Sequence, residues 1–182
     1  MIFLQIFINF MKDNLSIIQS KQVLDMVLVA NDFCLFTESL DSKVNIDILS
    51  YYQKVLPLLY LKGALLPAIE VSDESVNQRF VTAESWQEIF FAIESKFGEE
   101  DKYWFVDLNN DMIKESLADN LADIYQDMKD FILLFQDPKL SAKENAVSEC
   151  KRLFETHWGE RITKALNKIH LTIFNTKVEE DI

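Results

Sequence analysis

Four aspartates on one predicted helix are the residues of this sequence whose type and spacing could do chemistry. Asp119, Asp123, Asp127 and Asp130 recur at steps of four, four and three, which places them on one strip of an α-helix. Such a ladder can hold a divalent metal when a facing helix adds ligands. A solvated helix face is the simpler interpretation. The absence of any Glu-x-x-His pair weakens a ferritin-like di-iron site.

The predicted C-terminal helix carries two further groups. Its apolar, inward stripe consists of Val147, Cys150, Phe154, Trp158, Ala165 and Ile169. Arg161 falls on this stripe and His157 lies at its edge. Because an unpaired buried charge costs on the order of several kcal/mol, Arg161 predicts a carboxylate opposite it. The candidates for that carboxylate are Glu38, Asp123 and Asp127.

Three other polar residues lie in apolar surroundings and need hydrogen-bond partners, namely Asn31, Tyr60 and Lys62. The predicted polar cluster therefore contains Asn31, Glu38, Tyr60, Lys62, Asp123, Asp127, His157 and Arg161. In a structural interpretation, this cluster is a satisfied network that fixes the register of the helices. In a functional interpretation, it lines a cleft for a small anion or a metal, with His157 acting as ligand or general base beside Asp123 and Asp127.

Motifs for other chemistry are missing from the sequence. It has no G-x-S-x-G nucleophile motif, no glycine-rich phosphate loop and no C-x-x-C pair. No catalytic residue is therefore assigned. No cofactor is expected either, apart from a divalent metal for which Asp123, Asp127 and His157 are the candidate ligands.

The charge of the chain bears on its partners. Thirty acidic and eighteen basic residues give a formal net charge of -12, which opposes binding to the phosphate backbone of nucleic acid. A nucleic-acid partner would need an exposed basic stripe on the last helix, and the inward position of Arg161 interrupts that stripe. A protein partner is the better expectation.

The composition favours helices as the elements that position these groups. A chain of 182 residues with 49% hydrophobic residues can build one core, and its three glycines and three prolines leave few sites for tight turns. We expect an all-α fold in which residues 1–182 form a single-domain antiparallel bundle of about five to seven helices.

Two long helices are predicted in the first third of the chain. The first runs from about Leu15 to Ser39. Its expected inward face is Ile17, Leu24, Val27, Leu28, Asn31, Cys34, Leu35 and Glu38. The second runs from about Val44 to Leu66 and is apolar nearly all round in its second half, which is typical of a central helix. Pro57 should kink or split it.

The middle of the chain is less regular. Residues 68–81 show no persistent period and predict a loop, after which a shorter helix ends near Phe97 with Gly98 as its stop. Residues 98–114 are predicted to form an irregular loop. Its aromatic residues Tyr103, Trp104 and Phe105 should pack as a lid over the bundle, and a short strand is the alternative.

Two more helical stretches follow. Ser116 with Asp119 resembles a capping box and begins a helix that runs to Phe135. Its apolar seam is Leu117, Leu121, Ile124, Met128, Phe131 and Phe135. The last stretch runs from Ser141 to about Asn175 and is interrupted only by Gly159.

The N-terminal residues and the cysteines bear on location. Residues 1–10 are apolar and are interpreted either as an extension upstream of Met11 or as a helical turn laid on the core. They lack the positive region and cleavage site of a signal peptide and are too short to span a membrane. Cys34 and Cys150 each lie within a helical apolar pattern, where a free thiol acts as a small hydrophobic residue. We expect a cytoplasmic protein with no membrane partner.

Four blocks of sequence resemble one bacterial family. They are VANDFCLFTE (29–38), LPLLYLKGALLP (56–67), LADIYQDMKDF (121–131) and HWGERITKALNKIH (157–170). In content and order they are similar to domain-of-unknown-function family 5063. The resemblance spans residues 29–170 and implies a bacterial, all-α protein from a family whose activity is not characterised. It carries over no activity, cofactor or catalytic residue, and residues 1–10 lie outside it.

Two functions from different classes remain open. An acidic, helix-rich surface with aromatic loops favours an adaptor or regulatory protein that acts by binding another protein and is not an enzyme. The alternative is a metal-dependent hydrolase of a phosphorylated small molecule, built on Asp123, Asp127 and His157. The hydrolase requires these three side chains to converge on one point, and the adaptor does not.

Overall fold

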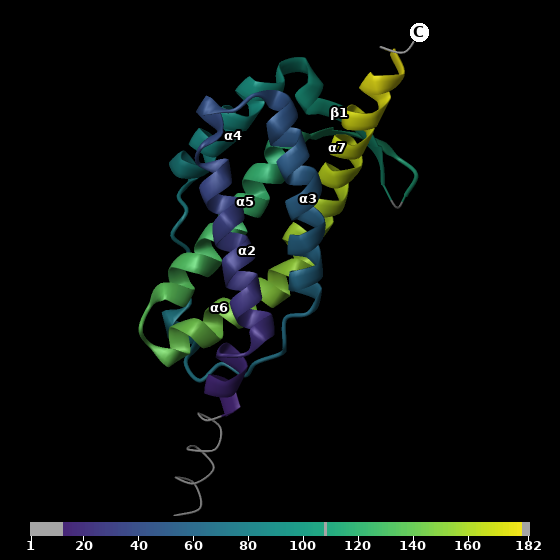
Figure 1. Ribbon diagram of the computed structural model, residues 1–182. Coiled ribbons are helices and arrows are strands. Elements are labelled where there is room, and N and C mark those ends of the chain that lie inside the picture. Colours follow the sequence, from purple (N-terminus) through teal and green to yellow (C-terminus); the bar gives the residue numbers. More distant parts are fainter. Residues whose placement is uncertain (1–12, 108, 180–182) are drawn as a thin grey trace, which may run out of the picture.

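The computed structural model describes residues 13–107 and 109–179, and it confirms the all-α bundle (Figure 1). The main helices are α2 (Lys21–Thr37), α3 (Asn45–Ala64), α4 (Ala83–Phe97), α5 (Leu117–Gln136), α6 (Leu140–Leu153) and α7 (Gly159–Glu179). Within these described residues no helix has the length and apolarity needed to cross a membrane. The possible extension at residues 1–10 lies outside the described residues.

Helix α5 occupies the centre of the bundle, with α2 and α3 in front of it in Figure 1. It packs against α2, α4, α6 and α7. The side-chain oxygen of Ser116 accepts a hydrogen bond from the backbone N–H of Asp119 and caps the helix, as the sequence indicated. Its predicted seam is buried from Leu117 to Phe131. The carboxylate ladder of α5 is therefore held by the most enclosed helix of the fold.

The helix predicted from about Leu15 to Ser39 is interrupted at Gln19 and Ser20, and most of the inward face predicted for its main part, α2, is wrong. The buried residues are Val23, Met26, Ala30, Phe33, Cys34 and Thr37. Leu24, Leu28 and Leu35 face outward instead and are 46%, 69% and 57% exposed. The helix carries two apolar stripes at helical spacing, and a periodic pattern alone cannot choose between them. The larger side chains of Met26 and Phe33 belong to the stripe that fills the core.

The sequence predicted that Pro57 would kink or split the second helix, but helix α3 is not split there. It runs without interruption over twenty residues. The ring of Pro57 lies on the exposed side of the helix, where water can bind the carbonyl group that has lost its backbone hydrogen bond. The opposite side, including Tyr52, Leu56 and Leu59, is fully buried.

Residues 98–116 differ from the predicted irregular loop. Helix α4 ends at Gly98, whose φ of 53° suits a glycine, and a short 3-10 turn (Gly98–Asp101) follows. Strands β1 (Lys102–Val106) and β2 (Met112–Ser116) then pair antiparallel, with Phe105 opposite Ile113. Half-buried and exposed residues alternate along most of both strands. This pattern is typical of a β-hairpin with one face on the bundle and the other facing outward.

A turn of π-helix (Phe154–Trp158) joins α6 to α7, where the sequence had predicted one helix interrupted only at Gly159. The indole N–H of Trp158 donates to the carbonyl oxygen of Cys150 and anchors the turn in the core. A Cβ at Gly159 would lie 2.3 Å from the carbonyl oxygen of Phe154, so only glycine fits here. The wide turn sets the direction in which His157 and the following Arg161 reach α5.

Candidate functional site

The ladder on α5 meets Arg161 at its N-terminal end. The Nη1 atom of Arg161 lies 3.2 Å from Asp119 Oδ2, and its Nη2 atom lies 2.8 Å from Asp123 Oδ2. Nη1 also donates to the side-chain oxygen of Asn120. The sequence correctly predicted that Arg161 needs a carboxylate opposite it, and Asp123 is one of the three candidates it gave.

His157 occupies the next position along the ladder. Its Nδ1 atom lies 2.6 Å from Asp127 Oδ2, and its Nε2 atom lies 3.5 Å from Asp123 Oδ2. Hydrogen bonds to Asp123 and to Asp127 raise the pKa of His157 from 6.5 to about 9, against the opposing effect of burial. The imidazole is therefore a cation at neutral pH, with both of its N–H groups directed at carboxylates.

Arg79 is the third cation that pairs with the ladder, and it lies in the loop between α3 and α4. Its Nη2 atom lies 2.8 Å from Asp127 Oδ1, and its Nε atom lies 3.1 Å from Asp130 Oδ2. The other oxygen of Asp130 accepts the backbone N–H groups of Phe80 and Val81 at 2.7 and 2.8 Å. These bonds fasten the loop to α5. Sequence reasoning missed Arg79 because it lies in a segment without periodicity, and only the tertiary fold brings it to the ladder.

Burial and neighbouring charges act differently on the four carboxylates. Burial raises the pKa of Asp130 and, together with the charge of Asp123, that of Asp119. Burial also acts to raise the pKa of Asp123, but hydrogen bonds from His157 and Trp86 and the charge of Arg161 bring it below its ordinary value. The side chain of Asp127 has no exposed surface. The ladder is thus a mostly buried ion-pair network, and the solvated-face interpretation is wrong.

The metal ligands suggested by the sequence do converge, but their donor atoms are already engaged. Asp123 binds His157, Arg161 and the indole N–H of Trp86, and Asp127 binds His157 and Arg79. Metal binding needs a neutral imidazole and free carboxylate oxygens. Among the described residues no group of three or more His, Cys, Asp and Glu could hold a metal ion. A protonated His157 is also not a general base.

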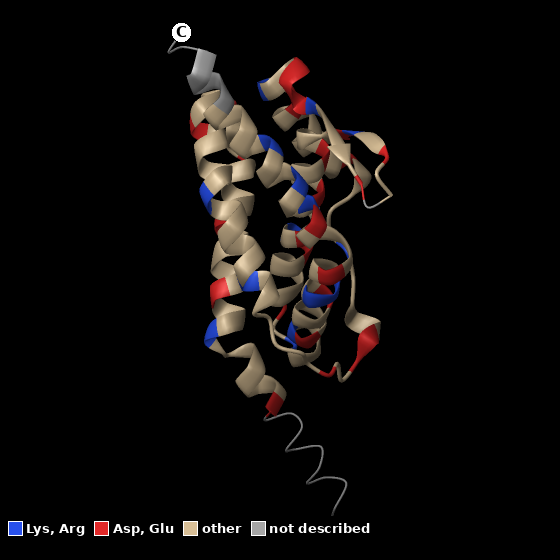
Figure 2. Ribbon diagram, turned by 90° about the vertical axis from the view of Figure 1, so that its right-hand side faces the viewer, with Lys and Arg blue, Asp and Glu red and all other residues tan. Residues whose placement is uncertain are grey.

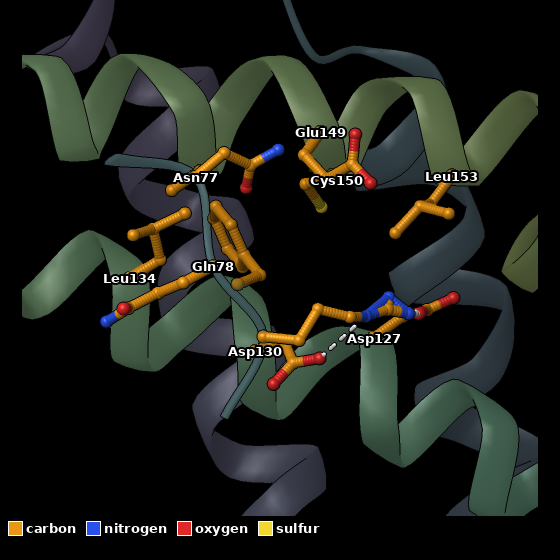
Figure 3. Close-up of a pocket in the computed structure, with 11 residues that line it drawn as sticks. Asn77, Gln78, Asp127, Asp130, Leu134, Glu149, Cys150 and Leu153 are labelled. Carbon is orange, nitrogen blue, oxygen red and sulfur yellow. Dashed lines mark hydrogen bonds and ion pairs between the residues drawn. The ribbon is translucent and has the colours of Figure 1, made fainter. Parts of the chain in front are cut away.

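A cavity of about 170 Å³ lies beside the ladder, under the loop that carries Arg79. Figure 3 shows the loop crossing between α5 and α6, with Asp127 and Asp130 on one wall and Glu149 and Cys150 on the other. Burial raises the pKa of the Cys150 thiol well above its usual range, so this thiol is not a nucleophile. Every buried polar side-chain atom of the described residues has a hydrogen-bond partner, so none points into the cavity unpaired.

Four residues of the predicted cluster lie elsewhere. Asn31 is exposed on the outward face of α2, and Lys62 lies 2.7 Å from Asp25 at the contact between α2 and α3. Glu38 accepts hydrogen bonds from Tyr125 and Lys129 at 2.8 and 2.7 Å. Tyr60 is 40% exposed and contacts the ring of Phe154 edge-on. The rotation of α2 that exposes its leucines also carries Asn31 away from the ladder.

Surface charge is mixed around these elements. In Figure 2 red and blue residues lie close together along the middle of the molecule, and red residues are prominent at both ends. Lys164 on α7 lies 2.9 Å from Glu115 and 3.0 Å from Glu160, and Lys151 donates to the carbonyl oxygen of Leu66. Lys151 and Lys164, two of the basic residues that an exposed stripe near the C-terminus would need, are therefore engaged within the chain, which weakens the case for a nucleic-acid site.

The β1–β2 hairpin presents an outward face that is mostly apolar. Trp104, Val106 and Met112 are 64%, 55% and 65% exposed, and Val106 lies directly opposite Met112. The inward face is held to the bundle by a hydrogen bond between Asn120 and the hydroxyl of Tyr103, and by Lys164 over the ring of Phe105. Tyr103 and Phe105 therefore anchor the hairpin to the bundle while Trp104 is exposed, so the three aromatic residues do not pack together as the predicted lid.

Comparison with known proteins places this arrangement in a family. The family model described as "Domain of unknown function (DUF5063)" matches residues 17–175. The crystal structure of protein BF1032 from Bacteroides fragilis is similar, with 32% sequence identity and a TM-score of 0.78, over 86% of this chain and 94% of that one. No curated protein matches the chain. As the resemblance of its four sequence blocks implied, the chain belongs to the DUF5063 family.

Proposed function

We propose that this protein is an adaptor or regulatory protein that binds another protein through the outward face of the β1–β2 hairpin. The observation that carries the proposal is Trp104, which is 64% exposed on a face shared with Val106 and Met112. In a half-buried hairpin the outward positions are ordinarily polar. Tryptophan is among the residues most enriched in the centres of protein interfaces.

Rigid support makes this face suited to binding. The hairpin is tied to α5 and α7 by the inward contacts of Tyr103 and Phe105 and by the ion pair between Glu115 and Lys164. A face that is already ordered loses little conformational entropy when it binds a partner. Exposed apolar side chains gathered on one such face are typical of an interaction site.

The alternative, a metal-dependent hydrolase, has less support. Its proposed ligands Asp123, Asp127 and His157 lie together, but the guanidinium groups of Arg79 and Arg161 hold the carboxylates that a metal would need. A divalent metal would have to displace these cations and deprotonate His157, whose pKa is about 9. The donor set fits a structural network better than a metal site.

A cytoplasmic location is part of the proposal. It is supported by the two free thiols, Cys34 and Cys150, which are both buried in the core. Disulfide bonds are rare in reducing compartments, where buried free cysteines act as small hydrophobic residues.

The proposal is tested by capturing partners with matched variants. Tagged wild type, Trp104→Ala and Phe91→Ala are used as baits in a lysate of the source cells, and the bound proteins are compared by quantitative mass spectrometry. Phe91 is the control because it is a similarly exposed aromatic residue, at 57%, on α4. We expect a protein that is retained by wild type and Phe91→Ala and is depleted at least tenfold with Trp104→Ala. Identical profiles for all three baits would contradict the proposal.

A further inference from the structure

The outward side of α2 carries a leucine seam that the other described residues leave uncovered. Leu24, Leu28, Asn31 and Leu35 follow one another at steps of four, three and four, the spacing by which two helices pack in a coiled coil. The three leucines are 46%, 69% and 57% exposed, and Asn31 is exposed between them. The solvent side of a bundle helix is normally polar.

Helix α3 widens this seam into a face. Its outward residues Leu58, Leu61 and Leu65 are 41%, 52% and 51% exposed. The two helices lie side by side in Figure 1, and contacts from Lys62 to Asp25 and from Tyr51 to Asp32 join them along their length. We call this surface the leucine face. It is made of Leu24, Leu28, Asn31, Leu35, Leu58, Leu61 and Leu65.

We propose that a second copy of this chain covers the leucine face, so that the protein is a homodimer with α2 packed antiparallel against α2 of its partner. The spacing of four, three and four reads the same from either end, so an antiparallel pairing places seam residues of one copy opposite seam residues of the other. In this arrangement Leu24 meets Leu35 of the second copy at each end. The two Asn31 side chains lie within about one helical turn of each other, where their amides can pair and fix the orientation.

The charge of the face suits a like-charged partner. The chain carries -12 overall, so two copies can approach only through a surface with little net charge. Beside the seam, Asp25 is paired with Lys21 and Lys62, and Asp32 accepts the hydroxyl hydrogen of Tyr51. Charges farther from the contact are screened beyond about 8 Å at physiological ionic strength.

The size of the face also agrees with a dimer. Helix α2 has seventeen residues and is about 25 Å long. A single seam of that length would make a narrow contact. Two helices lying roughly 10 Å apart give a strip about 20 Å wide, which is about 500 Å² per copy and about 1,000 Å² in total, the lower limit for a specific protein interface.

The first test is the mass of the protein in solution, measured by sedimentation velocity and light scattering. Wild type should have twice the chain mass of 21.3 kDa, and Leu28→Glu should become monomeric. Leu171→Glu is the control, because Leu171 is an exposed leucine of α7, at 47%, outside the leucine face. Circular dichroism should show the same helix content in all three proteins. A monomeric wild type, or a dimer that survives Leu28→Glu, overturns the proposal.

Cross-linking tests the orientation. With a short bifunctional maleimide, Asn31→Cys should link to Asn31→Cys of the second copy, whereas Leu35→Cys alone should not. A mixture of Leu24→Cys and Leu35→Cys should form mixed pairs, because these positions meet only in the antiparallel dimer. Cys34 and Cys150 are buried and stay out of the reaction. Linkage of Leu35→Cys to itself would indicate a parallel dimer and overturn the arrangement.

The proposed dimer and the proposed partner site can be contradicted independently of each other. Trp104→Ala should remain dimeric, and Leu28→Glu should retain the partner that the hairpin captures. A monomeric wild type that still depends on Trp104 for capture therefore overturns the dimer alone. A dimer whose capture profile ignores Trp104 overturns only the proposed function.

Discussion

The ladder on α5 and the leucine face on α2 and α3 differ in whether their side chains have partners within the chain. In the ladder, three cations lie between four carboxylates, and each acid is paired within the chain. On the leucine face and on the outer side of the hairpin, large apolar side chains have no cover from the described residues. The charged groups of the ladder already have partners within the chain, whereas the apolar side chains of the two exposed faces could still gain contacts from a bound partner.

The largest effect should follow the loss of Asp127. Its side chain is fully buried and pairs with both His157 and Arg79. Removing one partner of a buried ion pair costs about 3–5 kcal/mol. We expect about 2–3 kcal/mol for Asp127→Ala, because the remaining cations are partly exposed and can be hydrated. Urea unfolding measures this change. Exposed Asp111→Ala is the control, and equal stability of the two variants would contradict a structural role for the ladder.

A smaller effect is expected for Gly63→Ala, which tests how tightly the π-turn is packed. A Cβ at Gly63 would lie 2.2 Å from Trp158 Cη2 and 2.7 Å from Phe154 Cδ2. Forcing a methyl group into a packed core costs about 1–3 kcal/mol. The loss should appear as a lower urea midpoint with an unchanged m-value. A neutral result would show that the turn holding His157 can shift freely.

The ladder should also give stability a defined dependence on pH. The pKa of His157 is raised from 6.5 to about 9 in the folded protein, so the folded state holds the proton more tightly. This contribution is complete below about pH 6.5 and is lost as pH rises through about 9. Urea midpoints between pH 6 and 9.5 should fall for wild type and for the exposed control His170→Gln. In His157→Gln this part of the decline should be absent, and an unchanged slope would argue against the ion pairs.

The smallest effect should come from the uncovered side chains. Because Trp104 and Met112 are more than 60% exposed, Trp104→Ala and Met112→Ala should change the free energy of unfolding by less than about 0.5 kcal/mol. Both should nevertheless weaken partner capture. A loss of 2 kcal/mol or more in urea unfolding would show that the hairpin face is structural, and the contrast with the ladder would disappear.

Part of the site could be predicted from sequence because it depends on helix periodicity. Four aspartates at steps of four, four and three share one side of α5 in any fold, and Arg161 on an apolar stripe requires an acid. His157 with Asp123 and Asp127 followed from the same argument. Arg79 and Trp86 could not be predicted, since they reach the ladder from segments whose position relative to α5 is set by packing alone.

The sequence by itself determined the fold class, the boundaries of α3, α4 and α5 and the buried seam of α5, because these follow from local spacing, capping and turn residues. Only the tertiary structure decided which stripe of α2 faces the core. Two apolar stripes on one helix are equivalent until neighbouring side chains fill the space between helices, and here Met26 and Phe33 fill it. That rotation leaves Leu24, Leu28 and Leu35 outside, and the proposed dimer rests on it.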